Sequence, residues 1–420
     1  MALLKKARNF FKKVGTNPFF RFLTANILFS MSTFLVNLSL PIILQPELYT
    51  RFVYVFQMVF FLTTLFQFGI VVGLYKFYDK NKDDIFNVYY SLVLFINTIL
   101  ILLSFNVDNI VSKYLKLNDF SIQESVLFYM SVIVLGIFLF NKGKNVIEKS
   151  FKYMLVISAN VFIYRIIVIC ILSIYKVESL SLILFLVFIL PFVRDIRDYI
   201  VSTFHYVRPF KLKLRFLKSF VSFIIKVWIT GILYTISDKI FLISTKGLNS
   251  DLTTAISFSS GFVGIISIFT SSFSNFFLAK FSTNNINDIA NYVNRLKRFS
   301  PVYFLSLVLL DLIASVFIYY SYSQLANFTA LITFITLLRM GLISYLGLFT
   351  LLGKILNLLR IEIFLNIFRI VVIYCLCNFW HPENYILWYT IVVFTVPFPE
   401  LLFTFIIFYK INKMKALTSD

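Results

Sequence analysis

The stretch SFVSFIIKVWITGILYTISDKIFLIST, from Ser219 to Thr245, is long and apolar enough to cross a bilayer, yet it is polar at every fourth position. These positions are Ser222, Lys226, Thr230, Tyr234 and Asp238. In a helix they form one row, which at about 1.5 Å per residue is roughly 24 Å long, most of a hydrocarbon core of about 30 Å. A charged group at that depth costs about 2.5 kcal/mol or more. We therefore predict that the row faces other helices or a water-filled cavity, and that the rest of the chain forms the wall of that cavity.

The composition of the chain indicates a protein embedded in a membrane. Of its 420 residues, 60% are hydrophobic and only 14% are charged, whereas about a quarter of an average soluble protein is charged. The net charge is +20, but the basic residues are spread over many short segments between apolar runs. There is no basic domain to dock on a duplex, so the sequence argues against nucleic acid as a partner.

Twelve apolar runs, each bounded by polar or charged residues, can be marked along the chain. They span residues 21–43, 52–75, 86–105, 125–141, 151–175, 180–201, 219–245, 252–278, 300–321, 327–350, 361–380 and 384–409. The predicted fold class is therefore an all-α polytopic membrane protein with twelve transmembrane helices. An even number of helices places both termini on the same side of the membrane.

The distribution of basic residues predicts the orientation. Of the 39 Lys and Arg residues, 29 lie in the two termini and alternate loops, 5 in the opposite loops and 5 within the runs. Because cytoplasmic loops carry the excess of positive charge, both termini are predicted to be cytoplasmic. The largest basic segment, from Arg194 to Lys218, lies between the sixth and seventh runs. It predicts a six-helix bundle at 1–201, a basic cytoplasmic linker at 202–218 and a second six-helix bundle at 219–420.

Polar stripes also run along other apolar segments. In the first run the stripe consists of Asn26, Ser30, Thr33 and Asn37, and the second and eighth runs carry similar rows. Small and hydroxyl residues let membrane helices pack closely, so each stripe alone is compatible with tight packing. Because the stripes occupy the first two runs of each predicted six-helix set, we expect two related halves that place their corresponding helices around one central cavity.

Five basic residues lie inside the runs: Arg165, Lys226, Lys239, Arg339 and Arg369. The two lysines are nearer the ends of their run, where a long side chain can reach water at the interface. The three arginines are near the middle of the fifth, tenth and eleventh runs. There they are candidates for contact with an anionic substrate, or alternatively for internal ion pairs with Asp311 or Glu400.

The acidic residues within the runs are Asp238, Asp311 and Glu400. Glu400 follows Pro397 and Pro399, which remove backbone donors and are expected to interrupt the twelfth helix. A buried carboxylate can bind a proton or a sodium ion, and it can equally neutralise an arginine. All three acids are therefore candidates for coupling to a proton or sodium gradient.

The sequence shows no constellation for catalysis or metal binding. His205 and His381 fall in loops predicted on opposite sides, and no Walker-type glycine loop occurs. Cys170, Cys375 and Cys377 all fall inside apolar runs, which is typical of packing residues. We expect no metal, no cofactor and no enzymatic activity. The excess of positive charge at membrane depth instead predicts a transporter of an anionic cargo.

Two segments resemble a known family. They are LYTRFVYVFQMVFFLTTLFQFGIVVGLYKF at 48–77 and ITGILYTISDKIFLISTKGLNSDLTTAISFSSGFVGIISIF at 229–269. With twelve runs and cytoplasmic termini, the chain is similar over nearly its whole length to the Wzx-type polysaccharide flippases. These belong to the multidrug, oligosaccharidyl-lipid and polysaccharide exporter superfamily, which also contains lipid II flippases and drug antiporters. The resemblance implies a V-shaped pair of six-helix bundles in a bacterial inner membrane.

The resemblance also implies a substrate and a set of contacts. The cargo would be an undecaprenyl-diphosphate-linked oligosaccharide for O-antigen or capsule, moved from the cytoplasmic to the periplasmic leaflet through a cationic cavity. The candidate contacts for its diphosphate and sugars are Arg165, Lys226, Thr230, Arg339 and Arg369. Membrane lipids, a polysaccharide polymerase and a chain-length regulator are the other candidate partners.

Two other functions stay open. A drug or ion antiporter of the same fold is expected to favour acidic over basic groups in its cavity, and the deep arginines count against it. A membrane-embedded polysaccharide polymerase or ligase usually carries a large periplasmic loop, whereas the longest loop predicted on that side is only 106–124.

Overall fold

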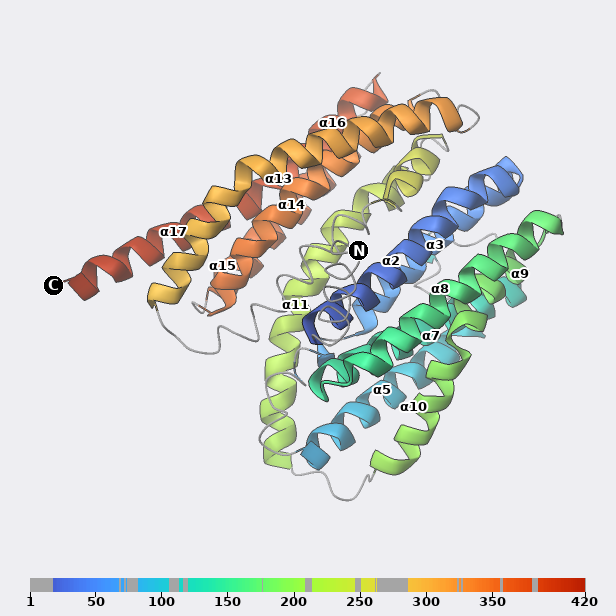
Figure 1. The fold of residues 1–420 in the computed structure, drawn as a ribbon, viewed down its shortest axis with the longest axis horizontal. Coiled ribbons are helices and arrows are strands. Elements are labelled where there is room, and N and C mark those ends of the chain that lie inside the picture. Colours follow the sequence, from blue (N-terminus) through green and yellow to red (C-terminus); the bar gives the residue numbers. More distant parts are fainter. Residues whose placement is uncertain are drawn as a thin grey trace, which may run out of the picture. The chain divides into compact units, whose positions relative to one another are not determined.

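The computed structural model is all-helical. It describes residues 18–67, 69–71, 73, 82–105, 113–115, 120–175, 177–207, 214–245, 251–260, 262, 286–322, 325, 328–355, 358–379 and 384–419. Within these ranges every regular element is a helix (Figure 1). The chain divides into two compact units, Met1–Ile232 and Leu233–Asp420.

The first five apolar runs form long helices of the first unit. They are α2 (Pro18–Ile43), α3 (Pro46–Phe66), α5 (Lys82–Ser104), α7 (Ile122–Ile147) and α8 (Phe151–Ile174). α7 begins with a capping box, in which the Ser121 side chain accepts from the Glu124 N–H and the Glu124 carboxylate accepts from the Ser121 N–H. At its other end α7 continues six residues past the apolar run, so Lys142 and Lys144 are helical residues and not loop residues.

Apolar and aromatic side chains hold these helices together. α2 lies along α8, while α3 and α5 lie against α7 (Figure 1). Phe22 and Ala25 of α2 pack on Met154 of α8, and the Phe29 ring stacks on Phe138 of α7 with the centroids 4.7 Å apart. Since lipid tails are as apolar as these side chains, close packing and interhelical hydrogen bonds decide the arrangement of membrane helices.

The sixth apolar run does not form one straight α-helix. It begins as α9 (Leu180–Leu184), passes through the π-helical segment η1 (Phe185–Ile189) and the 3₁₀ segment η2 (Leu190–Phe192), and continues as α10 (Val193–Tyr206). Pro191 gives the physical reason. Its nitrogen has no proton to donate to the preceding turn, and its ring crowds the carbonyl four residues back.

The stretch at 219–245 forms a helix as predicted, within α11 (Leu214–Thr245). The first part of α11 belongs to the first unit, where Trp228 Nε1 donates to the Leu65 carbonyl at 2.7 Å. Gly69, with a φ of +63°, comes so close to α11 that an added Cβ would lie 3.1 Å from the Ile224 carbonyl oxygen. Any other residue at this position would be strained by its backbone conformation and crowded by α11.

The described part of the second unit contains a helical stretch at 251–260 and several long helices. The long helices are α13 (Ile286–Ser321), α14 (Thr329–Ile355), α15 (Leu359–Phe379), α16 (Tyr385–Thr395) and α17 (Phe398–Ser419). α13 and α17 both pack on α14 (Figure 1). One apolar cluster includes Leu296, Tyr345, Phe403 and Ile407, and the Tyr345 hydroxyl donates to the Leu296 carbonyl at 3.2 Å.

The twelfth apolar run is interrupted, as its prolines predict. α16 ends at Thr395 and α17 begins at Phe398, so Pro397 lies between the two helices and Pro399 lies in the first turn of α17. The first turn of a helix tolerates proline, because the N–H groups there have no partner in the helix.

Eight helices of the described residues are long and apolar enough to cross a membrane. They correspond to the first five predicted runs and to the ninth, tenth and twelfth. The protein is therefore a multi-pass membrane protein. Of the eighth run, residues 261 and 263–278 lie outside the described part of the chain. The count of twelve membrane helices, the cytoplasmic termini and the division at 202–218 remain predictions.

Candidate functional site

Arg165 of α8 lies in the interior of the first unit, and its side chain is fully buried. Its guanidinium lies over the rings of Phe29 and Phe192, 5.4 and 5.5 Å from their centroids. Nη1 donates to the Ser32 hydroxyl at 3.1 Å and to the Thr33 hydroxyl at 2.6 Å. Nε and Nη2 have no hydrogen-bond partner within the described ranges. Because a guanidinium has five N–H donors, much of the donor capacity of Arg165 is unused.

Among the described residues Arg165 has no acidic partner, because none of the ion pairs formed there includes it. The contacts described for its guanidinium are with hydroxyl groups and aromatic faces. The polar stripe of α2 supplies one of those hydroxyls through Thr33, and Asn26 and Asn37 of the same stripe are buried as well. The alternative of an ion pair between Arg165 and Asp311 or Glu400 remains a prediction, because these two acids belong to the second unit.

Arg369 of α15, in contrast, forms an ion pair with Glu400 of α17. Its other Nη atom donates to the Asn366 side-chain oxygen at 2.5 Å. Arg369 is 1% exposed and Glu400 is 8% exposed, so the pair is shielded from solvent. The alternative of an internal ion pair thus holds for Arg369, and Glu400 is its acid.

Arg339 of α14 is also buried, at 3% exposure. Its Nη2 donates to the Met340 sulfur at 3.0 Å, and its charge interacts favourably with Glu400. One turn earlier on α14, the Thr336 hydroxyl is 2.5 Å from the Tyr389 hydroxyl of α16. Arg339, Arg369 and Glu400 thus form a buried cluster of two positive charges and one negative charge.

Asp311 of α13 is fully buried, and neither of its carboxylate oxygens has a hydrogen-bond partner among the described residues. On the same helix, the Tyr303 hydroxyl donates to the Gly341 carbonyl of α14 at 3.0 Å, and Leu307 fills the space beside Gly341. Positions 303, 307 and 311 are four apart and share one helical face. Asp311 therefore lies on the face of α13 that packs against α14, inside a candidate membrane span.

The residues of the polar row of α11 lie in different environments. Ser222 and Lys226 are exposed, whereas Thr230 is buried and its hydroxyl donates to the Val227 carbonyl at 2.8 Å. The side chains of Tyr234 and Asp238 lie outside the described part of the chain. The roles of Lys226, Thr230 and Asp238 in binding or coupling therefore remain predictions.

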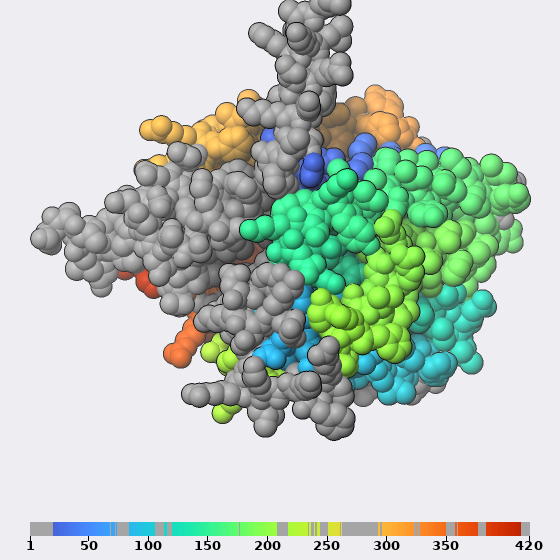
Figure 2. Space-filling view, turned by 60° about the horizontal axis from the view of Figure 1, so that its bottom comes forward, coloured from blue at the N-terminus to red at the C-terminus, as the bar shows by residue number. Residues whose placement is uncertain are grey.

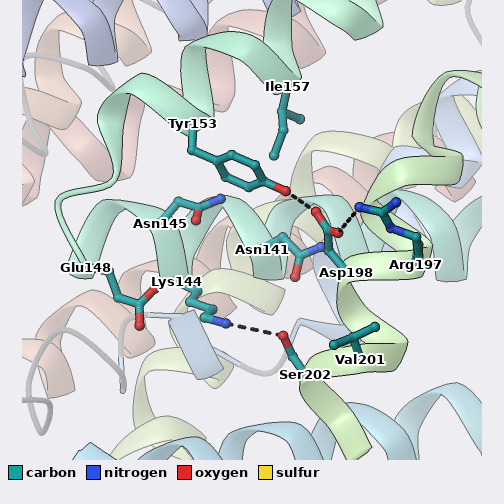
Figure 3. A pocket seen from close by; sticks show the side chains of 10 residues that line it. All are labelled: Asn141, Lys144, Asn145, Glu148, Tyr153, Ile157, Arg197, Asp198, Val201 and Ser202. Carbon is teal, nitrogen blue, oxygen red and sulfur yellow. Dashed lines mark hydrogen bonds and ion pairs between the residues drawn. The ribbon is translucent and has the colours of Figure 1, made fainter. Parts of the chain in front are cut away.

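Two cavities open between α8 and α10 in the first unit, the first also lined by α7 and the second by η2. The first has a volume of about 440 Å³, and Tyr153 and Asp198 lie on its wall (Figure 3). The second has a volume of about 540 Å³ and is bounded by Tyr164 and Arg194. Ile157 and Arg197 line both cavities, and the two together are named the double cavity.

Sequence reasoning missed the side chains of this double cavity. The sequence RDIRD at 194–198 was assigned to the basic segment that sets the topology, and Tyr153 was one more aromatic residue in an apolar run. One signal was present, because Pro191 just before RDIRD predicts an interrupted helix and hence space beside it.

Within the described residues, no group of three or more His, Cys, Asp or Glu side chains is placed to hold a metal ion.

Comparison with known proteins identifies the fold. No family model matches the sequence, and no curated protein matches it. One solved structure that matches is an inward-facing multidrug resistance MATE family transporter of the MOP superfamily, with 11% identity, a TM-score of 0.63, and coverage of 94% of this chain and 96% of that chain. An outward-facing one matches with 16% identity, a TM-score of 0.61, and coverage of 96% and 98%.

A third solved structure, a MATE protein in complex with MaL6, matches with 13% identity, a TM-score of 0.57, and coverage of 96% of this chain and 98% of that chain. The chain therefore has the fold of the MATE transporters of the MOP superfamily over nearly its full length. At these identities the likeness concerns the fold, and the substrate has to be argued from the side chains of this chain.

Proposed function

We propose that the protein is an alternating-access transporter that flips undecaprenyl-diphosphate-linked oligosaccharide repeat units from the cytoplasmic to the periplasmic leaflet. The fold supports transport, because matched structures of the same fold are described as inward-facing and outward-facing transporters. Fold alone does not select the cargo. The choice of cargo in this proposal rests on the buried charged side chains.

The observation that carries the proposal is the state of Arg165. Among the described residues this buried guanidinium has two unbonded nitrogens and no acidic partner, and such a group is costly unless a ligand compensates it. A diphosphate is the natural complement, because its oxygens accept the paired, charge-assisted bonds that a guanidinium donates. Since Arg165 is covered by α2 and Phe192, the cargo reaches it only when α2 and α8 separate at this level.

The charge cluster of the second unit supports the same class of cargo. Two arginines and one carboxylate leave a net charge of one positive, so Arg339 and Arg369 together still favour an anion. In this proposal Arg165, Lys226, Thr230, Arg339 and Arg369 contact the diphosphate and the sugars. Polar residues such as Thr230 give adaptable hydrogen bonds to the glycan.

Coupling to an ion gradient is assigned to Asp311 in this proposal. Its carboxylate is buried and makes no hydrogen bond among the described residues, whereas Glu400 forms an ion pair with Arg369. A buried acid with no fixed partner is the group most able to gain and lose a proton or to hold a sodium ion as its surroundings change.

The second candidate function is a drug or ion antiporter of the same fold. Asp311 favours it, because a buried acid suits a cationic drug as well as a proton. Arg165 opposes it, since an uncompensated cation repels such a cargo. The two functions differ in the sign of the charge that crosses the membrane.

The proposed setting is a bacterial inner membrane with both termini in the cytoplasm. The proposed partners are the lipid-linked glycan, membrane lipids, a polysaccharide polymerase and a chain-length regulator. The proposal includes no nucleic acid, metal or cofactor, and a proton or sodium gradient drives the transport.

The test is reconstitution of the purified protein into vesicles with a lipid-linked oligosaccharide and a probe that reacts only in the outer leaflet. The proposal expects the glycan to become accessible at a rate that depends on the protein and on Arg165. A parallel assay with a cationic dye tests the antiporter. Dye exchange without glycan movement would exclude the flippase and favour the antiporter.

A further inference from the structure

Asn37 of α2 is a buried polar residue that the proposed transport mechanism does not use. Its side chain is 1% exposed, and among the described residues neither its amide nitrogen nor its amide oxygen has a hydrogen-bond partner. An amide carries two N–H donors and an acceptor oxygen. Burial of such a group without partners is costly, and buried polar groups are nearly always hydrogen-bonded. The amide of Asn37 is therefore a candidate for contact with a ligand.

Asn37 lies on the helix interface that also holds Arg165. α2 and α8 are adjacent, and dark-blue atoms of α2 are visible beside green atoms of α8 in Figure 2. Phe22 contacts Phe151 near the start of both helices, with the ring centroids 6.1 Å apart. Farther along, Thr33 accepts a hydrogen bond from Arg165, so the two helices run in the same direction. Asn37 is four residues beyond Thr33 and shares its face of α2, about 6 Å farther along the axis.

The corresponding turn of α8 is apolar. On the face of α8 that carries Arg165, the next buried residues are Val168 and Leu172. Neither side chain can donate or accept a hydrogen bond, which explains why Asn37 finds no partner there. Because Asn37 and Arg165 lie on the same interface, a separation of α2 from α8 that opens Arg165 to the cargo also uncovers Asn37.

Arg165 supplies charged donors one helical turn from this amide. Its Nη1 is used by the Ser32 and Thr33 hydroxyls, whereas Nε and Nη2 have no partner among the described residues. The unused N–H groups of a guanidinium complement a phosphate. An unused amide complements a neutral group that both donates and accepts hydrogen bonds. The two side chains together match a ligand in which a phosphate is bonded directly to a neutral polar group.

The amide has an unused donor and an unused acceptor, and this decides which part of a lipid-linked oligosaccharide fits it. A second phosphate would accept from the amide nitrogen but would leave the amide oxygen without a donor. The polyprenyl chain has no polar atom for either. Sugar hydroxyl groups both donate and accept, so they complement the whole amide. The first sugar is bonded directly to the diphosphate, so its hydroxyl groups lie only a few bonds from the phosphate that Arg165 holds.

We propose that Asn37 is a specificity-determining residue that binds the first sugar of the cargo while Arg165 binds the adjoining diphosphate. The amide nitrogen of Asn37 donates to one sugar hydroxyl, and the amide oxygen accepts from a hydroxyl of the same sugar. This role rests on the proposed function, because it takes the diphosphate at Arg165 as its fixed point. It adds a requirement of its own, since a polyprenyl diphosphate without a sugar leaves the amide unpaired.

The test is ligand binding to the purified full-length protein in detergent, measured by isothermal titration calorimetry. The ligands are a short-chain polyprenyl diphosphate and the same compound with one glucose, one galactose or one N-acetylglucosamine on its diphosphate. We expect at least one sugar-bearing compound to bind at least about tenfold more tightly than the bare diphosphate, because only a sugar pairs with the buried amide. Asn37→Leu should remove this preference and keep the affinity for the bare diphosphate, whereas Arg165→Gln should weaken binding of every compound.

Thermal unfolding of the same variants distinguishes a ligand contact from a structural role. Asn37→Leu replaces an unpaired buried amide by an apolar side chain of similar size, so the unfolding midpoint should stay the same or rise. Asn26→Leu is the matched control, because Asn26 is buried on the same face of α2 but makes an interaction within the protein. It should lower the midpoint and keep the preference for the sugar.

The possible failures of this proposal and of the proposed function differ. Equal binding of all compounds by the parent protein, or a preference that survives in Asn37→Leu, would overturn the role of Asn37 and leave Arg165 as an anion contact. A lower unfolding midpoint of Asn37→Leu without ligand would show that the amide has a partner in the protein, and would overturn that role too. Binding of none of the compounds, or binding that does not depend on Arg165, would overturn the proposed function together with the role of Asn37.

Discussion

Arg369 and Glu400 form a buried ion pair that joins α15 to α17, although the two residues are 31 positions apart in the chain. The pair lies next to the break between α16 and α17, and Asn366 holds the other edge of the guanidinium. The second unit thus holds Arg369 at a fixed position by means of an acid, whereas Arg165 has no such acid among the described residues of the first unit.

Removal of Glu400 alone should destabilise the protein more than removal of Glu400 together with Arg369. Glu400→Gln leaves two buried arginines without their acid, which costs about 3 to 5 kcal/mol, whereas Arg369→Gln leaves Glu400 with Arg339 and costs less. The double variant should recover much of that loss. Thermal unfolding in detergent, analysed as a double-mutant cycle, measures the coupling. Simple additivity of the two single effects would show that the pair does not form.

Neutralisation of Arg165 should stop transport and leave the fold intact. Arg165→Gln removes the charge, and we expect flipping to fall by at least about tenfold because the charge-assisted contacts with the diphosphate are lost. Arg165→Lys should restore part of the activity, since the charge survives but the planar arrangement of donors does not. Surface glycan at equal protein level is the measurement.

Lys152→Gln on the exposed side of α8 is the control for this experiment. A lysine of the α7 end would be a poorer control, because Lys142 lies 5.7 Å from the Phe29 ring that also covers Arg165. Normal export by Arg165→Gln would remove Arg165 from the path of the cargo and with it the main support for an anionic substrate.

Replacement of Asp311 should abolish coupling to an ion gradient with little change in the stability of the fold. Because its carboxylate makes no hydrogen bond among the described residues, Asp311→Asn should change the free energy of unfolding by less than about 1 kcal/mol. Transport should lose its dependence on a proton or sodium gradient. The measurement is flipping in vesicles with and without each gradient. A variant that responds to the gradient like the parent would show that the coupling group lies elsewhere.

Cysteines along α11 should differ in their reaction with a water-soluble thiol reagent. In a background without Cys170, Cys375 and Cys377, we expect Ser222→Cys to react quickly, since Ser222 is exposed. Thr230→Cys should react slowly, because Thr230 is buried. Supply of lipid-linked substrate should change these rates if α11 lines an alternately opened route. Rates that stay constant in the presence of substrate would mean that this row is only a packing surface.

The orientation of the chain is testable by reporter fusions. The 29 to 5 distribution of basic residues predicts a cytoplasmic signal from a fusion after Lys415 and a periplasmic signal from a fusion after Asn118. The opposite result at either position would break the twelve-helix topology. A fusion inside 202–218 should give the cytoplasmic signal as well.

The elements that the sequence predicts well are those set by local chemistry. The apolar run around Trp228 forms a helix, and the twelfth run breaks at Pro397, because length, hydrophobicity and a missing N–H act within a few residues of the chain. The fold can be predicted for the same reason, because the apolar runs and their order are visible in the sequence. In the described part of the chain eight helices are long and apolar enough to be candidate spans, and the count of twelve stays a prediction.

The pairing of the deep charges could not be predicted in the same way. The sequence left Asp311 and Glu400 as equal partners for three arginines, because a choice between them depends on which helices lie side by side. Glu400 forms an ion pair with Arg369, whereas Asp311 faces α14 and takes part in none of the ion pairs among the described residues. The double cavity was missed for a related reason, since it arises from three helices and from a π and 3₁₀ segment whose direction is set by packing.

Pro397 and Pro399 have an electrostatic effect beyond the break they cause. Pro397 and Pro399 have no N–H to donate to the carbonyls four residues earlier at the end of α16, where the Val396 N–H bonds the Val393 carbonyl instead, and this end is the negative end of the α16 dipole. Arg369 lies at that end, with Nη1 3.5 Å from the Val396 carbonyl oxygen. A cation in this position gains about 0.3 to 1 kcal/mol from the dipole alone. The peptide backbone therefore serves as a second counter-charge for Arg369, which no substitution of an acidic side chain can remove.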